Sequence, residues 1–424
     1  ITLFESAVQW YCFLLYGTAA GTVFHKVFFS QTGNGTTALI LSYMSFAIGY
    51  IAGPFGAIFF GHIGDRKGRK VTMYASLLMM GISTSIIGIL PPAASAGVGV
   101  VIVLQLMRLA QCFGRGGTWG GGILMAYENV PENKRSFYAA IPQIGLPIGF
   151  GLSSILIAVP TLLLPEDIFF TWGWRIPFLA AIILTVIVIR QKGEMMETED
   201  YKKAQAKLEA EEAEGKKHKV GFIPMVKGYW KTLLLGCGTR WVDGTFYNIF
   251  IVWILSYCIN WLGMPLIQTY IITIIACIFK IPFTLFGGWC AQKLGNTRTF
   301  VIGALASAVL SIPTLKVIEL SKGNLAITII GIVLGWSIAY NLIWAVISSL
   351  WSSYFETEVR YSGISFVYHV PSFLVAGMVP TICTLLINYG KGDTIYVGIY
   401  STVVALISAA CALALKARHD RGEK

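Results

Sequence analysis

Uninterrupted apolar stretches of twenty or more residues recur along the whole chain and are separated by shorter polar segments. A hydrocarbon layer of about 30 Å takes about 20 helical residues, whereas barrel strands would show shorter segments of alternating polarity. We therefore predict an all-α membrane protein with twelve transmembrane helices. Six are expected in the first half, at 4–29, 36–61, 71–90, 98–127, 137–164 and 172–189, and six in the second, at 232–262, 266–290, 300–318, 325–350, 364–388 and 395–415.

Between the halves, residues 190–219 carry eight basic and eight acidic side chains, a composition that cannot enter lipid. We predict a charged cytoplasmic loop at 190–221, between an N-terminal bundle at 1–189 and a C-terminal bundle at 222–424 that ends in a short cytoplasmic tail. The stretch 194–217 lacks proline and is rich in Ala, Glu and Lys, so a helix at the membrane surface and a flexible linker both fit it.

The two halves share short patterns at a nearly fixed offset. Residues 61–68, GHIGDRKG, align with residues 288–295, GWCAQKLG, at an offset of 227, and Arg135 aligns with Arg360 at an offset of 225. Matches in corresponding loops are typical of internally duplicated transporters. We therefore expect two pseudo-symmetric six-helix bundles with a binding site between them.

Composition excludes a soluble enzyme or a disordered binder, because 55% of the residues are apolar and 12% are charged, against about 25% charged in a soluble domain. The net charge of +11 reflects membrane orientation and not nucleic-acid binding. With the even-numbered connections and the C-terminus on one side, 23 of the 32 basic residues gather there, and the other side holds Lys26, Lys316, Lys322 and Lys391. Basic residues are retained in the cytoplasm, so both termini are predicted cytoplasmic in a cell membrane.

The cysteines and histidines do not suggest an enzyme. All eight cysteines fall inside apolar runs, and no His, Cys or carboxylate cluster has catalytic or metal-binding spacing. We expect no enzyme activity, no cofactor and no metal. The chain opens inside an apolar pattern without a basic segment or a cleavage site, so no removable signal peptide is predicted.

The loop after the second predicted span reads G-x-x-x-D-R-x-G-R-K at 61–70. Its glycines permit a very short turn, and its basic cluster holds the loop at the cytoplasmic face. The pattern closely resembles the loop 2-3 signature of the major facilitator superfamily, which implies a latch between conformational states. Simple anchoring by positive charge is the alternative interpretation. We expect a conformational gate formed by Gly61, Asp65, Arg66, Gly68, Arg69, Glu128, Arg135 and Arg360.

Further patterns occur at R-x-x-Q (108–111), GGTWGG (116–121), E-x-x-P (128–131), KR (134–135), FY (137–138), P-Q-x-G (142–145), WGWRIPF (172–178) and RYSG (360–363). Together they resemble the metabolite:proton symporter family, which contains permeases for shikimate, 2-oxoglutarate, citrate and proline or betaine. The resemblance implies the major facilitator fold and alternating-access uptake of a small polar metabolite driven by protons.

Three acidic positions of that family pattern are missing. Gln9 and Cys12 stand where the family has acids in span one, and Thr118 stands where it has glutamate in span four. The second-half loop has Gln292 in place of aspartate. Proton coupling therefore requires another acid.

Asp243 is the surviving candidate, because it lies near the middle of span seven. A carboxylate at that depth costs roughly 2.5–3.5 kcal/mol, so it is expected to face a cavity or a cation. Arg240 is one turn away, and the family tends to place an arginine and an acid at this spacing. We predict a proton-coupling group of Asp243, Arg240 and Arg108. A static pair that only fixes the helix is the alternative.

Cations outnumber acids inside the predicted spans. Arginine forks bind carboxylates bidentately, so an organic anion is the expected ligand. Arg115 is the preferred selectivity residue, whereas Arg175 is interpreted as pairing with backbone carbonyls. The predicted substrate-binding residues are Arg115, Gln9, Tyr16, Trp119, Gln143, Tyr247, Asn248, Lys280 and Asn341. Tyr340 and Tyr368 also line the expected cavity and are interpreted mostly as packing residues, and the lone His369 as a structural group.

We thus expect a monomeric secondary active transporter that imports a small organic acid, a mono- or dicarboxylate, by proton symport. Its partners are the small molecule, protons and the lipid bilayer, without nucleic acid. Missing acids leave a proton-independent facilitator or exchanger open, and a zwitterionic compatible solute is another possible cargo. A channel or a membrane enzyme fits less well, because the duplicated halves favour rocking-bundle transport.

Overall fold

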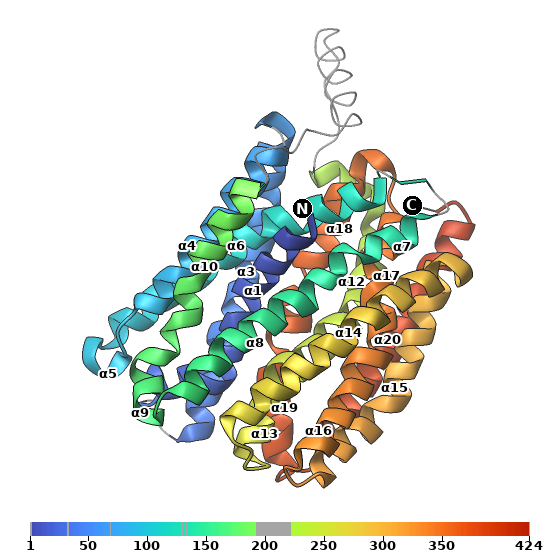
Figure 1. The fold of residues 1–424 in the computed structure, drawn as a ribbon. Helices are drawn as coiled ribbons and strands as arrows, with labels where there is room; N and C mark the ends of the chain where they lie inside the picture. Colours follow the sequence, from blue (N-terminus) through green and yellow to red (C-terminus); the bar gives the residue numbers. More distant parts are fainter. Residues whose placement is uncertain are drawn as a thin grey trace.

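A computed structural model describes residues 2–31, 34–67, 69–128, 130–131, 134–191 and 222–423. Within these ranges every regular element is a helix. Most of the early helices, blue to green, lie on one side of the molecule and most of the late helices, yellow to red, on the other, and the short blue-green helix at 135–140 lies among the late ones (Figure 1). Both chain ends lie at the same end of the molecule, which is the arrangement that an even number of spans produces.

The first group of helices ends before the charged central segment. It comprises α1 (Thr2–Ala19), η1 (Ala20–Phe24), α2 (His25–Val27), α3 (Gly35–Lys67), α4 (Arg69–Ile89), α5 (Ala93–Ala96), α6 (Val98–Glu128), α7 (Arg135–Ala140), η3 (Pro142–Ile144), α8 (Gly145–Leu163), α9 (Glu166–Ile168), η4 (Phe169–Gly173) and α10 (Arg175–Gln191).

The second group begins after that segment. It comprises α12 (Phe222–Asn248), η6 (Ile249–Trp253), α13 (Ile254–Asn260), α14 (Leu266–Leu294), α15 (Asn296–Leu320), α16 (Leu325–Ile332), η7 (Val333–Ala339), α17 (Asn341–Ser352), α18 (Thr357–His369), η8 (Phe373–Gly377), α19 (Val379–Tyr389) and α20 (Ile395–Asp420).

Ten helices in the described part of the chain are long and apolar enough to cross a membrane, and an eleventh span is a pair bent by 40° around residue 370. The first predicted span forms α1, η1 and α2 in continuous succession. Each predicted span thus corresponds to helix, and the predicted all-α fold is confirmed.

Several predicted boundaries were wrong by more than a turn. The sixth helical segment begins at Glu166 and not at 172, the seventh at Phe222 and not at 232, and the eleventh at Thr357 and not at 364. The second ends at Lys67 and not at 61, and the twelfth at Asp420 and not at 415. The extra turns carry polar residues that an apolar-run criterion excludes, and Tyr229 interrupts α12 with a non-helical φ of −117° and ψ of 17°. The predicted surface helix at 194–217 lies outside the described residues.

Short π-helical turns interrupt several spans, among them η1 in the first and η6 in the seventh. Each widened turn locally breaks the regular ladder, and such turns occur frequently at functional sites. Because spans one and seven correspond in the duplicated halves, the two π turns are related by the repeat. They mark where the first group of helices meets the second.

Helices α1 and α8 pack almost backbone to backbone. A Cβ placed on Gly149 would lie 2.2 Å from the carbonyl oxygen of Ala7 and 2.7 Å from the amide nitrogen of Tyr11. Only glycine permits this approach, as in other close helix pairs in membranes. Helix α8 in turn packs on α14 of the second group, so it joins the two groups.

Candidate transport site

The centre of the molecule holds an ion pair on α12. Arg240 donates to one oxygen of Asp243, and both side chains are about 1% exposed. The phenol of Tyr340 donates to the other carboxylate oxygen. A carboxylate loses its hydrogen bonds with water when it is buried. The guanidinium of Arg240 and the hydroxyl of Tyr340 replace those hydrogen bonds here.

Arg115 brings a second guanidinium to this centre from α6. It lies 3.9 Å from the ring centroid of Phe13 and 4.7 Å from that of Trp10, and it donates through Nη2 to the hydroxyl of Tyr368 on α18. The ring of Tyr368 lies 4.4 Å from the guanidinium of Arg240. Tyr368 therefore stands between one arginine of the first helix group and one of the second.

Lys280 supplies a third cation from α14 and is fully buried. Its ammonium donates to Asn341 Oδ1 at 3.0 Å and to the carbonyl of Trp336 at 3.5 Å, and it lies 4.4 Å from the ring centroid of Tyr340. We call Arg115, Arg240, Asp243, Lys280, Tyr340 and Tyr368 the central charged cluster. It contains three cations and one anion.

Arg108 was predicted to join the proton-coupling group, and the structure places it in an aromatic cage. The guanidinium lies 4.4–4.7 Å from the ring centroids of Phe13, Tyr16 and Phe46, and it donates to Gln111. Its described contacts include neither Asp243 nor Arg240. Its role in coupling stays a prediction, whereas Arg115 is connected to Arg240 of the ion pair through Tyr368.

The remaining predicted substrate residues whose side chains the structure describes are buried: Gln9, Tyr16, Gln143, Tyr247, Asn248 and Asn341. Gln143 and Trp344 join the two halves reciprocally, since Trp344 Nε1 donates to the Gln143 carbonyl at 3.0 Å and Gln143 Nε2 donates to the Trp344 carbonyl at 3.4 Å. Trp10 packs edge-on against Trp344 and Tyr247, at centroid distances of 5.5 and 5.8 Å. These residues form the aromatic wall beside the central charged cluster.

Several polar atoms in this region have no hydrogen-bond partner among the described residues: Gln9 Nε2, the Tyr247 hydroxyl, Asn248 Oδ1 and His369 Nε2. Asn248 donates to the Gly244 carbonyl at 2.8 Å, and Tyr16 shares a hydrogen bond with Ser45. These atoms can form hydrogen bonds with a polar ligand or with water. Gln9, Tyr247 and Asn248 were all predicted to contact substrate, whereas Tyr16 already has a partner.

Tyr340 and Tyr368 are candidate functional residues that the sequence patterns did not identify. Both were interpreted mostly as packing, yet each hydroxyl binds a charged residue. A signal for their role was present in the sequence. A buried tyrosine hydroxyl usually forms a hydrogen bond, and the buried charged groups in these spans also require hydrogen-bond partners. Which tyrosine meets which charge depends on how the helices cross.

Arg175 agrees with its sequence interpretation. It donates to the carbonyls of Gly88 at 2.9 Å and Leu90 at 2.6 Å, and to that of Thr171 at 3.0 Å. The carbonyls of Gly88 and Leu90 link α10 to the end of α4, whereas Thr171 belongs to η4, directly before α10. The contacts are structural and lie on backbone atoms.

The predicted gate lies where α3, α4 and α6 end or begin. Gly61, Asp65 and Arg66 lie in the last turns of α3, Arg69 begins α4 and Glu128 ends α6. Gly68 lies outside the described residues, and so do the side chains of Asp65, Arg66, Arg69 and Glu128, and that of Trp119 in the predicted substrate site. Arg360 Nε donates to the Phe355 carbonyl at 3.3 Å, and Arg135 begins α7. Near them α14 packs closely on α7, since a Cβ on Gly288 would lie 2.7 Å from Ala140 Cβ.

Toward the opposite end, two tyrosines tie the helix groups together. Tyr43 of α3 donates to Ser256 at 2.7 Å and approaches the Val252 carbonyl at 3.3 Å, while Tyr270 of α14 donates to Thr22 at 3.2 Å. Tyr43 and Tyr270 are 227 positions apart, the same offset as the loop repeat. We call these reciprocal contacts the outer tyrosine pair.

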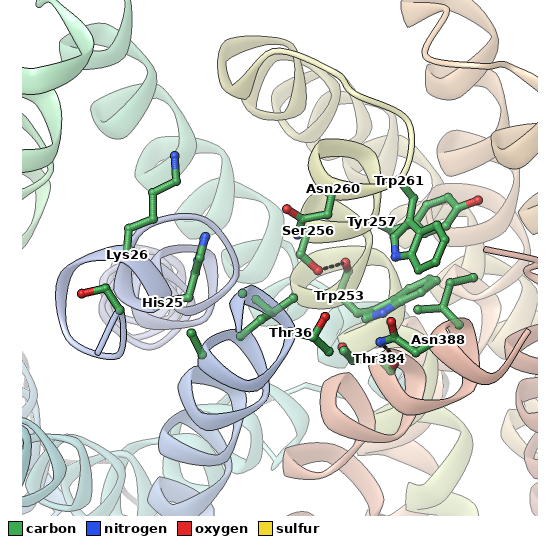
Figure 2. Close-up of a pocket in the computed structure, with 15 residues that line it drawn as sticks. His25, Lys26, Thr36, Trp253, Ser256, Tyr257, Asn260, Trp261, Thr384 and Asn388 are labelled. Atoms are coloured by element: carbon green, nitrogen blue, oxygen red, sulfur yellow. Dashed lines mark hydrogen bonds between the residues drawn. The ribbon is translucent and has the colours of Figure 1, made fainter. Parts of the chain in front are cut away.

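Beyond the outer tyrosine pair, a cavity of about 740 Å³ opens between the two groups. Figure 2 shows its walls, with His25, Lys26 and Thr36 from the first group facing Trp253, Asn260 and Asn388 from the second. Ser256 lines the cavity and accepts from Tyr43, so this contact of the outer tyrosine pair lies at the cavity wall. The residues that line the cavity include none of the central charged cluster.

A charged network holds the rim beside this cavity. Lys316 donates to Asp393 at 2.7 Å and to Glu319 at 3.0 Å, and the Thr394 amide donates to Glu319 at 2.8 Å. The hydrogen bond from Lys316 and that from the Ile395 amide hold the pKa of Asp393 below its ordinary value. The rim charges are thus largely satisfied by one another.

A buried, charge-bearing centre between two duplicated groups of apolar helices, with a cavity on one side, defines a multi-pass membrane transporter. The family model for the Major Facilitator Superfamily matches residues 10–380, and the chain belongs to this superfamily. It is a transporter of small molecules and not an enzyme.

The curated relatives agree with the resemblance seen in the sequence. The chain is 34% identical to the inner membrane metabolite transport protein YhjE of Escherichia coli, covering 99% of this chain and 94% of that protein. It is 31% identical to the shikimate transporter of E. coli, with 97% and 92% covered. A proline/betaine transporter of Salmonella typhimurium is 27% identical, with 98% and 82% covered.

Solved structures show the same fold. A D-xylose–proton symporter superimposes with a TM-score of 0.71 at 16% identity, covering 98% of this chain and 95% of that one. The partially occluded inward-open form of the E. coli xylose transporter XylE gives 0.72 at 15% identity, with 97% and 94% covered. At this identity the match establishes the major facilitator fold alone.

Proposed function

We propose that this transporter imports a small organic acid together with protons, by alternating access across the cell membrane and with both termini in the cytoplasm. The observation that carries the proposal is the central charged cluster. Its cations come from both halves of the chain, and its single carboxylate is buried between an arginine and a tyrosine.

Charge balance supports an anionic cargo. The described part of the chain contains five buried basic side chains from Arg and Lys, and its buried acids are Glu5 and Asp243. Uncompensated charge in a low-dielectric interior is costly, and a bound carboxylate offsets that cost. Arg115 offers a planar fork suited to a carboxylate, and the buried ammonium of Lys280 lies in the other half.

Alternating access follows from the position of the cluster between the two halves. We take residues 1–189 and 222–424 as the moving units and the segment between them as their cytoplasmic connection. Opening on the outer side requires the outer tyrosine pair to separate. Opening on the side of the termini requires α14 to separate from α7.

Asp243 is the proton carrier in this proposal. When ionised, it accepts from Arg240 and Tyr340, and when protonated it releases Arg240 from the ion pair. The proton neutralises the one carboxylate of the cluster, so the net positive charge of the cluster rises by one and Arg240 is free to attract an anion. Proton and anion binding thereby support each other, which is the thermodynamic requirement for symport.

The test is transport by purified protein in proteoliposomes. Asp243→Asn is expected to abolish accumulation driven by a pH gradient and to retain at least half of the counterflow rate, because the amide keeps the shape of the carboxylate without its titration. The matched control is Asp393→Asn at the outer rim, which should keep both activities. Full pH-driven accumulation by the Asp243→Asn protein would overturn the proposed coupling.

A second candidate is a facilitator or exchanger without proton coupling, favoured by the missing acids at Gln9, Cys12 and Thr118. Intact counterflow of the unmodified protein without uphill uptake under a pH gradient would support it.

A zwitterionic cargo is a further alternative, suggested by the name of the proline/betaine relative. The panel for cargo identification is shikimate, 2-oxoglutarate, citrate and betaine, because a specific ligand raises the melting temperature by mass action. A shift with betaine alone would favour the zwitterion, whereas a shift with one of the three acids would favour the anion.

A further inference from the structure

The hydroxyl of Tyr368 is hydrogen-bonded to the Arg115 guanidinium, the group to which the proposed function assigns substrate binding. Its hydroxyl accepts from Arg115 Nη2, and its ring lies 5.3 Å from that guanidinium and 4.4 Å from the guanidinium of Arg240. All three side chains are buried. A neutral oxygen thus sits where a carboxylate oxygen would be expected.

We propose that the Tyr368 hydroxyl is an internal stand-in for the substrate carboxylate, and that cargo binds Arg115 by displacing it. This inference rests on the proposed function, because it requires Arg115 to bind an anion. It adds Tyr368 to the proposed site and predicts the direction in which loss of its hydroxyl changes the affinity for cargo. Tyr368 is a positioning residue whose hydrogen bond is made in the empty transporter and broken in the loaded one.

The energetics favour exchange in the presence of cargo. A hydrogen bond between an arginine and a carboxylate is charge-assisted and often bidentate, whereas a phenol offers one neutral acceptor. In the empty protein the phenol partly satisfies the buried guanidinium, which lowers the cost of the empty state. The same bond must be broken before cargo binds, so it also weakens cargo binding.

The ring of Tyr368 has a separate part in the structure. It packs between the two guanidiniums and lies edge-on to Trp351, at a centroid distance of 6.2 Å. Phenylalanine keeps these contacts and removes only the hydroxyl. The substitution therefore isolates the hydrogen bond without emptying the space between the halves.

The bond also joins the two halves, since Arg115 belongs to α6 and Tyr368 to α18. Cargo that replaces the hydroxyl removes one contact between the halves at their centre. The transporter would therefore separate its halves more readily when loaded than when empty.

The experiment measures the substrate concentration that gives half-maximal counterflow in proteoliposomes. The substrate is whichever of shikimate, 2-oxoglutarate and citrate most raises the melting temperature of the unmodified protein. Tyr368→Phe is expected to lower the half-saturation concentration by about threefold to tenfold, because the empty state loses a hydrogen bond to a charged group. Damage to a binding site raises this value, so a merely structural role cannot give the expected sign. Tyr354→Phe is the matched control, since its hydroxyl hydrogen bond with Thr297, at 2.6 Å, lies outside the cluster, and it should leave the value unchanged.

A double-mutant comparison identifies Arg115 as the group in competition. Arg115→Lys keeps the charge and loses the fork, so it should raise the half-saturation concentration about tenfold, and Tyr368→Phe should have little further effect in that background. An unchanged or raised value for Tyr368→Phe, together with a raised value for Arg115→Lys, would overturn this inference and leave the anion site standing. If Arg115→Lys has no effect, or if no acid of the set stabilises the protein, the proposed anion site fails and the inference falls with it.

Discussion

Lys280 shows how strongly one residue can constrain this molecule. Its ammonium is fully buried and donates to an amide oxygen and a carbonyl, and within the described chain no carboxylate forms an ion pair with it. The neighbouring Asn341 is held in place by the Lys280 carbonyl, at 2.8 Å, and accepts from Thr284 at 3.1 Å. Neutral acceptors offset the burial of a charge only in part. Burial of this cation lowers the stability of the empty protein, and an anionic ligand would offset that cost.

This leads to a prediction at the residue scale. Lys280→Met is expected to leave the melting temperature of the empty protein unchanged or higher, because it removes a buried charge and keeps the volume. Asn341→Ala is expected to destabilise the protein by about 1–3 kcal/mol, because it leaves the ammonium with fewer acceptors. Thermal unfolding of both variants in the same detergent gives the comparison.

Equal losses of stability in the two variants would contradict this account of Lys280. The binding measurement is separate. Lys280→Met should weaken the stabilisation by the acid panel, whereas a control change at the rim, Lys391→Met, should not.

At the scale of elements, sequence patterns predicted helices well and contacts between them poorly. Periodic apolar runs identify each span because every backbone polar group in lipid must be bonded within its helix. The Arg240–Asp243 pair was predictable because both residues lie one turn apart on α12. The contacts of Tyr368 with Arg115, and of Tyr340 with Asp243, join residues more than ninety positions apart, and no local pattern specifies them.

The outer tyrosine pair is an element-scale device with a testable effect. Removing both hydroxyls, with Tyr43→Phe and Tyr270→Phe, deletes contacts that join α3 to α13 and α14 to η1. Each neutral hydrogen bond is worth about 0.5–1.5 kcal/mol, so the loss of both shifts the population toward separated outer ends. Spin labels at Thr36 and Asn388, on facing walls of the cavity, should report longer distances in a background without the native cysteines.

Tyr257→Phe is the control for this experiment. Tyr257 also lines the cavity, but its hydroxyl donates to the Gly392 carbonyl at 3.3 Å within the same half. Its loss should leave the label distances unchanged. If the double variant gives the same distances as the control, the outer tyrosine pair does not hold the two halves together.

At the scale of the whole molecule, charge distribution predicts the orientation. Helix α20 has 26 residues and is therefore about 39 Å long, with Lys391 before it and Arg421 just after it. In the sequence, 23 of the 32 basic residues fall in the connections predicted on the side of both termini. Because basic loops are retained in the cytoplasm, that side should face the cytoplasm and the 740 Å³ cavity should face outward.

Surface labelling of intact cells tests this orientation. In a background without the native cysteines, a membrane-impermeant maleimide should label Lys391→Cys and not Arg421→Cys. Both sites should react once detergent has opened the membrane, which controls for exposure. Labelling of Arg421→Cys alone in intact cells would reverse the orientation and place the cavity on the cytoplasmic side.

The sequence by itself determined the helical spans, the superfamily and which few charged residues lie within the spans, because burial in lipid leaves a strong imprint on local composition. Only the tertiary structure decided how those charges are satisfied. It separated Arg108, caged by aromatic rings, from Arg115, and it turned two tyrosines from packing residues into partners of Arg115 and Asp243. The physical reason is that a helix fixes which residues share a face, whereas the crossing of distant helices fixes which faces meet.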